Sequence, residues 1–163
     1  WNGGGTVKLS IVDPAYGPCS AEFVRSIQEA VDPENELGQK GTGIGMAPIG
    51  HNVTVVTPDV VTVNIQATIT LQTGYAIGQV ESAVTTALQS YIQSLRESWA
   101  DANEKNVYTC DVFVARVSAT IVNVPGVANV TNVKLNGGSA DIILTQSGQT
   151  QQLPKLGEVS LNV

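Results

Sequence analysis

The chain has 163 residues and a formal net charge of -6, and only 13% of its residues are charged. This length suits one domain with its own core, and the eight Lys and Arg residues form no basic stripe of the kind that binds nucleic acid. No run approaches the roughly 18 apolar residues of a membrane span, and Cys19 and Cys110 allow at most one bridge, which excludes a disulfide-dense scaffold.

The first predicted elements are a strand and a helix. Residues Thr6–Val12 alternate in polarity, which predicts a strand whose buried face carries Val7, Leu9 and Ile11. Ser20 is a suitable N-cap for a helix that ends before Asp32 and Pro33. The apolar residues of this helix fall on one face: Phe23, Val24, Ile27, Ala30 and Val31.

A loop without periodicity is predicted from Glu34 to Gly45, and its length is typical of a functional, mobile or packed segment. Its end lies in the stretch GTGIGMAPIGHNVTVVTP, which starts at Gly41. We interpret these glycines as conformational relief for a loop that passes close to other backbone, and Ile49 as an apolar plug. His51 then leads into a strand predicted for Asn52–Thr57.

The most regular pattern covers Val61–Leu71, where apolar residues alternate with Thr, Asn and Gln. It predicts a strand with one buried face and one polar, uncharged face. A turn at Thr73 and Gly74 leads into a helix from about Ala76 to Trp99. The apolar residues of the helix recur at spacings of three and four: Ile77, Val80, Val84, Leu88, Tyr91, Leu95 and Trp99.

The following stretch supports either β-structure or a helix. We expect a short strand at Val107–Thr109, an N-cap at Asp111, and a helix from about Val112 to Val122.

The C-terminal part is predicted to be β-structure. A strand at Val127–Leu135 is followed by Asn136 and Gly137, a pair typical of a hairpin turn, and by a return strand at Ala140–Thr145. A last short strand is expected at Glu158–Val163.

This order of elements predicts the α+β class, specifically a ferredoxin-like split β-α-β-β-α-β sandwich with an additional short helix and a C-terminal β-hairpin and strand. We expect residues 1–5 to be a remnant of a preceding region, 6–125 to form the sandwich core, and 126–163 to complete or extend the same domain. The second sheet face would be covered by the C-terminal hairpin or by another subunit.

The glycine-rich stretch has the spacing of neither common nucleotide-binding motif. Gly41, Gly43 and Gly45 precede a predicted strand instead of a helix, and His51 follows Gly50 where a P-loop has Lys. His51 also has no Cys, Asp or Ser at a spacing that predicts a catalytic partner.

Other chemically capable side chains have structural explanations. Asp32, Glu34 and Glu36 flank a helix end, and Asp101 and Glu104 belong to a polar tail, so we interpret both groups as solvated charges.

Cys110 beside Asp111 is interpreted as a core thiol, and Tyr75, Tyr91 and Trp99 as core or interface residues. The sequence therefore predicts no catalytic, cofactor-binding or metal-binding residues, and no enzyme.

Three blocks, in their order and spacing, resemble the baseplate J-like proteins of phage tails, prophages and related contractile injection systems. They are GTGIGMAPIGHNVTVVTPDVVTVNIQATI, VPGVANVTNVKLNG and LPKLGEVSL, preceded by GGGTVKLSIVD and SAEFVRSIQEAVD. Together these blocks cover nearly the whole chain, and none is catalytic.

The resemblance implies the C-terminal part of a baseplate wedge protein, a structural subunit located in the virion tail baseplate and assembled in the bacterial host cytoplasm. Its partners would be other baseplate and tail proteins, in a homo- or hetero-oligomeric ring, without a cofactor. Two alternatives stay open. One is a small-molecule-binding regulatory module of ferredoxin-like fold, with the glycine-rich loop and His51 at the ligand edge. The other is an enzyme such as a cell-wall hydrolase, which would require a polar cleft with a carboxylate of raised pKa, and the spacing of residues does not suggest one.

Overall fold

A computed structural model of the chain describes residues 1–100 and 110–163. The chain divides into two compact units, one made of Trp1–Asp59 and Thr145–Gln152 and the other of Val60–Leu144 and Leu153–Val163. Helices and strands occur in both, which confirms the predicted α+β class. The expected domain organisation, with a remnant at 1–5, a core at 6–125 and a C-terminal extension at 126–163, stays a prediction. Within the described ranges, every helix is too short or too polar to cross a lipid bilayer.

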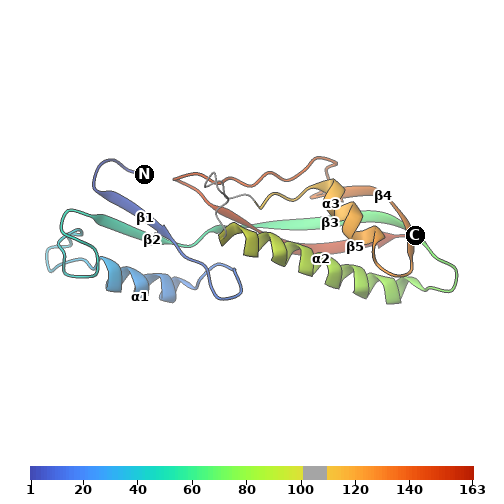
Figure 1. Cartoon of the computed structure of the whole chain (residues 1–163), viewed down its shortest axis with the longest axis horizontal. Helices are drawn as coiled ribbons and strands as arrows, with labels where there is room; N and C mark the ends of the chain where they lie inside the picture. Colours follow the sequence, from blue (N-terminus) through green and yellow to red (C-terminus); the bar gives the residue numbers. More distant parts are fainter. Residues whose placement is uncertain (101–109) are drawn as a thin grey trace. The chain divides into compact units, whose positions relative to one another are not determined.

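The smaller unit is a βαβ unit with a two-stranded parallel sheet. Strand β1 (Thr6–Ser10) pairs in register with β2 (Asn52–Val56), and helix α1 (Ala21–Val31) connects them (Figure 1). As predicted, the Ser20 side chain caps α1, accepting a hydrogen bond of 3.2 Å from the Phe23 N–H. Val53 and Val55 form the centre of a small core, packed against Ile11, Val24, Ile27, Val31 and Ala47.

The predicted burial of β1 is wrong. Val7 and Leu9 are 43% and 38% exposed, although they lie on the apolar side of the strand. The apolar residues of α1 pack instead on Val53 and Val55 of the neighbouring β2. Helix α1 therefore covers one strand of the pair and leaves the apolar side chains of the other partly open to solvent.

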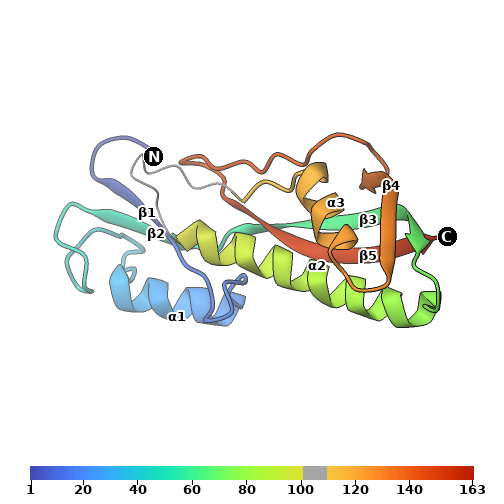
Figure 2. The same ribbon diagram turned by 45° about the vertical axis from the view of Figure 1, so that its right-hand side comes forward.

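The larger unit contains a three-stranded sheet in the order β4-β3-β5. Its strands are β3 (Asp59–Leu71), β4 (Val127–Leu135) and β5 (Gln152–Asn162), and β3 and β4 are antiparallel. Figures 1 and 2 show the long helix α2 (Ile77–Ala100) running along the sheet, with the short helix α3 (Val114–Val122) beside it. The bounds of β3, α2 and α3 agree closely with the sequence predictions.

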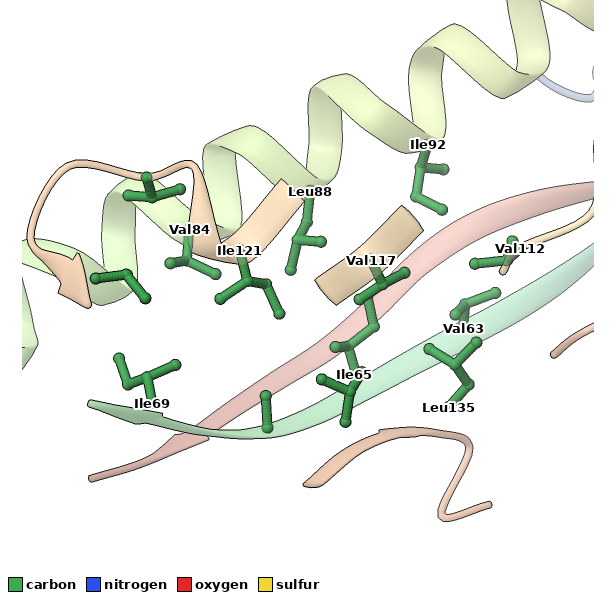
Figure 3. Packing of buried hydrophobic residues seen from close by; sticks show 14 of the residues in the cluster. Val63, Ile65, Ile69, Val84, Leu88, Ile92, Val112, Val117, Ile121 and Leu135 are labelled. Carbon is green, nitrogen blue, oxygen red and sulfur yellow. The ribbon is translucent and has the colours of Figure 1, made fainter. Parts of the chain in front are cut away.

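The core of the larger unit is built on one side of β3. Ile65 and Ile69 alternate with exposed polar residues along the strand, and their side chains point toward both helices (Figure 3). Leu88 of α2 and Ile121 of α3 are fully buried against this side. Because strand side chains alternate between faces, β3 supplies an unbroken apolar strip to the two helices and a polar strip to the opposite face.

The ferredoxin-like arrangement is not confirmed, because the strands form two sheets. In a split βαβ sandwich another strand lies between the two parallel strands, but here β1 and β2 pair directly through all five of their residues. Strand β3 pairs with β4 and β5 instead.

The predicted C-terminal hairpin is wrong beyond its turn. Asn136 and Gly137 have the positive φ angles of such a turn, 50° and 81°, but no return strand forms at Ala140–Thr145. Ile142 instead exchanges backbone hydrogen bonds of 2.9 Å with Val112, just before α3. Residues after the turn therefore brace the start of a helix and do not extend the sheet.

Helix α3 is capped from a distant part of the chain. Asp111, the predicted cap, accepts a hydrogen bond of 2.7 Å from the Leu144 N–H, whereas the Asp141 carboxylate accepts one of the same length from the Val114 N–H. The prediction that Asp111 caps α3 is therefore wrong. The capping carboxylate comes from Asp141, which is distant in sequence. The strand expected at Val107–Thr109 lies outside the described residues.

Strand β5 is longer than the predicted Glu158–Val163 and includes Pro154 and Gly157, which local propensity disfavours in a strand. The Pro154 carbonyl accepts a hydrogen bond of 2.6 Å from the Arg96 side chain of α2. Pairing with the 13-residue β3 outweighs the local preference.

We expect Leu88→Ala to lower the free energy of unfolding by about 2 to 5 kcal/mol, because it leaves a cavity between α2 and the sheet. Urea denaturation measures the change. The control Gln89→Ala alters an exposed position on the same helix and should stay within about 0.5 kcal/mol of the unmodified chain. Equal stability of the two variants would contradict the core described here.

Candidate functional site

The glycine-rich loop that first suggests a phosphate site has a defined backbone conformation. Gly41, Gly43 and Gly50 have φ angles of 71°, 76° and 84°. The Gly50 N–H donates to the Gly41 carbonyl at 2.8 Å, and the Ala47 N–H donates to the Val31 carbonyl at the end of α1 at the same distance. The loop then enters β2, as predicted, so the element that follows it is a strand and not the helix whose N-terminus a phosphate-binding loop requires.

His51 lies at the entrance to β2 with its side chain exposed. Its backbone N–H donates to the Pro48 carbonyl at 3.1 Å, and its imidazole has no hydrogen-bond partner within residues 1–100 and 110–163. The small-molecule alternative, which places His51 at the edge of a ligand site, stays a hypothesis.

Asp32 is the buried charged residue of the described chain, with an exposed fraction of 2%. Its carboxylate accepts hydrogen bonds of 2.8 Å from the Gly41 N–H, through Oδ1, and from the Val53 N–H, through Oδ2. The interpretation of Asp32 as a solvated helix end is therefore wrong. The carboxylate joins the end of α1, the glycine-rich loop and β2.

The Gln28 side chain of α1 forms hydrogen bonds with β2, the same strand that Asp32 contacts. Its Nε2 donates to the Val53 carbonyl at 3.0 Å, and its Oε1 accepts from the Val55 N–H at 2.9 Å. Sequence reasoning missed this residue. The available signal was its spacing of four from Asp32, which places both side chains on one face of the helix end.

The other candidate carboxylates from the sequence are either exposed or outside the described residues. Glu34 and Glu36 are exposed, as predicted, and Asp101 and Glu104 lie outside the described residues. Within the ranges 1–100 and 110–163, no three His, Cys, Asp or Glu residues lie close enough to hold a metal ion. The absence of catalytic, cofactor and metal residues stays a prediction.

Cys19 and Cys110 form no disulfide with each other and both thiols are buried, which confirms the interpretation of Cys110 as a core thiol. Burial raises the pKa of the Cys19 thiol, the nearby Asp13 carboxylate raises it further, and the Thr57 hydroxyl partly offsets these effects. A thiol with a raised pKa is a poor nucleophile at neutral pH.

A cleft of about 550 Å³ lies between α2 and α3. Tyr91 and Arg116 line it, together with Asp111 and several small polar residues. Burial raises the pKa of Tyr91, while the Phe113 backbone and the Arg116 guanidinium lower it in part. The Tyr91 hydroxyl is buried at the wall of the cleft, and no described residue pairs with it in full hydrogen-bond geometry.

The other predicted aromatic residues differ in position. Trp99 is buried at the end of α2, as predicted, whereas Tyr75 precedes the helix and is 45% exposed. The Tyr75 ring packs over Gly126, whose φ of 95° and close ring contact exclude a side chain there.

The most unusual surface of the smaller unit consists of large apolar side chains that point into solvent. We name it the loop patch, and its members are between 64% and 81% exposed: Leu37, Ile44, Met46 and Ile49. The interpretation of Ile49 as an apolar plug is therefore wrong. All four come from the loop between α1 and β2, and apolar side chains that gather on a surface are typical of protein–protein contact sites.

The second extended surface is the side of the three-stranded sheet opposite α2 and α3. We name it the outer sheet face; on β3 it carries Thr62, Asn64, Gln66, Thr68 and Thr70. Cross-strand register places Thr131 beside Thr68 and Lys134 beside Gln66. The face is polar and carries few charges, as the alternation in the sequence predicts.

Comparison with known proteins identifies one family. Residues 63–162 match the family model of the Baseplate J-like protein C-terminal domain, from within β3 to the end of β5.

Two Bacillus subtilis (strain 168) proteins are similar over 161 residues, or 99% of the chain. Phage-like element PBSX protein XkdT is 28% identical, and Uncharacterized protein YqbT is 27% identical. The chain spans 41% of the length of each relative.

We expect Asp32→Ala to reduce the free energy of unfolding by about 2 to 4 kcal/mol, because it leaves two backbone N–H groups without their acceptor. Urea denaturation measures this loss, with the exposed Glu34→Ala as the matched removal of a carboxylate. If Glu34→Ala costs as much as Asp32→Ala, the bridging role of Asp32 is refuted.

We expect neither thiol of the folded chain to react readily with Ellman's reagent at pH 8, because Cys19 is 9% and Cys110 1% exposed. In denaturant both should react at least about tenfold faster, since unfolding exposes both thiols and restores the usual pKa of Cys19. Rapid modification of either thiol in the folded chain would contradict its burial.

Proposed function

The chain belongs to the baseplate J-like family, whose C-terminal domain its residues 63–162 match, and on this premise we propose that it is a structural subunit of a phage-type tail baseplate. It acts by burying its surfaces on neighbouring subunits. The observation that carries the proposal is the family match together with two extended surfaces suited to protein contact, the loop patch and the outer sheet face.

The loop patch suits a fixed contact because its backbone is already ordered. Hydrogen bonds from Gly50 to Gly41 and from Ala47 to Val31 hold the loop around Ile44, Met46 and Ile49, and hydrogen bonds between Asn35 and Gln39 hold the turn that carries Leu37. A preorganised loop loses little conformational entropy on binding, so more of the hydrophobic free energy appears as affinity. Leu37, Ile44, Met46 and Ile49 would insert into an apolar depression of a neighbouring subunit.

The outer sheet face suits a broader contact. Stable protein interfaces usually bury more than about 1,000 Å² in total, and uncharged Thr, Asn and Gln side chains are less costly to desolvate than charged ones. Five such residues lie in one row along β3. Among the described residues, the helices α2 and α3 cover the opposite side of the sheet, so the outer sheet face is open to a partner.

The proposed partners are other baseplate and tail proteins, in a ring assembled in the bacterial host cytoplasm and located in the virion tail. The proposal includes no catalytic step, cofactor or nucleic acid. Its support is the family match together with the loop patch and the outer sheet face.

Co-expression of the full-length protein that carries this sequence with neighbouring tail proteins tests the proposal. Sizing and electron microscopy should reveal a wedge or ring complex. We expect the double substitution Met46→Asp with Ile49→Asp to reduce its yield at least about tenfold, because both side chains would bring charge into an apolar contact. Gly43 is unsuitable for such a test, because a side chain there would meet Ile49.

Ser82→Asp is the matched control, since it adds a carboxylate to an exposed position of α2. It should leave assembly unchanged. Normal assembly of the double variant would remove the loop patch from the proposal, and Thr68→Glu would then test the outer sheet face. A protein that stays alone with all neighbouring tail proteins would overturn the assembly function itself.

A further inference from the structure

The two outer edges of the β1–β2 sheet differ in a way that bears on binding. On β2, the Val53 and Val55 backbone groups point away from β1 and would be open to another strand. Side chains of α1 occupy this edge: Asp32 accepts from the Val53 N–H, and Gln28 donates to the Val53 carbonyl and accepts from the Val55 N–H. These two side chains satisfy the backbone as a third strand would, and they close the edge to further pairing.

Among the described residues, no side chain covers the backbone edge of β1 in this way. Hydrogen bonds from Asn52 to Gly5 and from Ile11 to Val56 set the ladder so that the Lys8 backbone points away from β2. No described residue bonds to the Lys8 N–H or carbonyl. Gln149 and Gln151 contact the Lys8 and Ser10 side chains, at 2.6 and 2.7 Å, and leave the backbone edge unpaired.

The side chains along this edge favour the addition of a strand. Val7 and Leu9 are 43% and 38% exposed on the α1 side of the sheet, where apolar residues of a third strand would cover them. A third strand would bury the exposed parts of Val7 and Leu9 and pair the open backbone groups of β1.

The charge of Lys8 favours a partner strand with an acidic residue opposite it. Its ammonium group donates to the Gln149 carbonyl and lies 5.1 Å from the centre of the Trp1 ring, with no carboxylate partner among the described residues. Antiparallel pairing of β1 with a second copy, in the register that joins all five residues, would place Lys8 opposite Lys8. Like charges directly opposite each other destabilise a sheet, whereas an acidic residue at that position would stabilise it.

We propose that the open edge of β1 binds an extended strand of a partner protein that carries apolar residues beside Val7 and Leu9 and an acidic residue opposite Lys8. This inference goes beyond the proposed assembly function and does not depend on it. Backbone pairing provides the general affinity, and the Lys8 charge and the Val7–Leu9 strip provide the selectivity.

Two capped synthetic peptides test the inference on the 163-residue chain: Ser-Thr-Val-Glu-Val-Thr-Ser, and the same peptide with Lys in place of Glu. Amide chemical shifts and hydrogen exchange report where they bind. The Glu peptide should bind at least about threefold more tightly than the Lys peptide and should protect the Lys8 amide. Lys8→Glu should reverse this preference, which a merely structural role of Lys8 would not predict.

Lys8→Pro removes the outward N–H without removing a backbone hydrogen bond of the described chain, and it should abolish binding of both peptides. If that variant does not fold, the charge reversal still decides the matter. Absence of binding by either peptide, or equal binding without protection at residue 8, would overturn the inference. A concentration-dependent dimer that protects the Lys8 amide without peptide would also overturn it, in favour of self-pairing.

Because the peptides replace the partner, this test can fail while ring assembly succeeds, and the two proposals are distinguishable.

Discussion

The packing of α2 and α3 on one side of β3 is the interaction on which the larger unit depends. The alternation of Val63, Ile65, Ala67 and Ile69 with polar residues gives this strand a continuous apolar strip, and each of the four is at most 2% exposed. Without it neither helix would have a surface against which to bury Leu88 or Ile121. Hydrophobic burial of this extent is the main source of folding free energy in a domain of this size.

The same strand determines what remains for partners. Since strand residues alternate between faces, the burial of one face of β3 leaves Thr, Asn and Gln on the other. A β-sheet with helices on one side exposes its second face, and in an assembly protein that face is suited to a contact between subunits. The structural role and the polar pattern of β3 therefore have one physical origin.

In the smaller unit, side-chain hydrogen bonds connect the helix to the sheet in addition to apolar packing. Asp32 and Gln28 connect the end of α1 to β2, and Asp32 also holds the glycine-rich loop through Gly41. A buried carboxylate is tolerated here because two backbone N–H groups replace its water. The loop that carries Ile44, Met46 and Ile49 owes its ordered conformation partly to this arrangement.

Much of the fold follows from the sequence, because local patterns specify local structure. The helices α1, α2 and α3 and the long strand β3 were predictable from the spacing of apolar residues, and the Ser20 cap from residue type. The family resemblance rested on blocks spread along the chain, and the match over residues 63–162 confirms it.

Pairing between distant residues decided the rest. Asp141 caps α3 from 27 residues away, Ile142 pairs with Val112 instead of extending a hairpin, and β5 forms despite Pro154 because β3 lies beside it. The buried role of Asp32 was equally hidden, since a carboxylate after a helix looks the same in sequence whether solvent or backbone N–H groups surround it. The sequence alone determined where helices and strands form, because local patterns specify them. Tertiary structure decided which residues pair with each other and which apolar side chains stay exposed, because these depend on contacts between distant residues that form only in the folded chain.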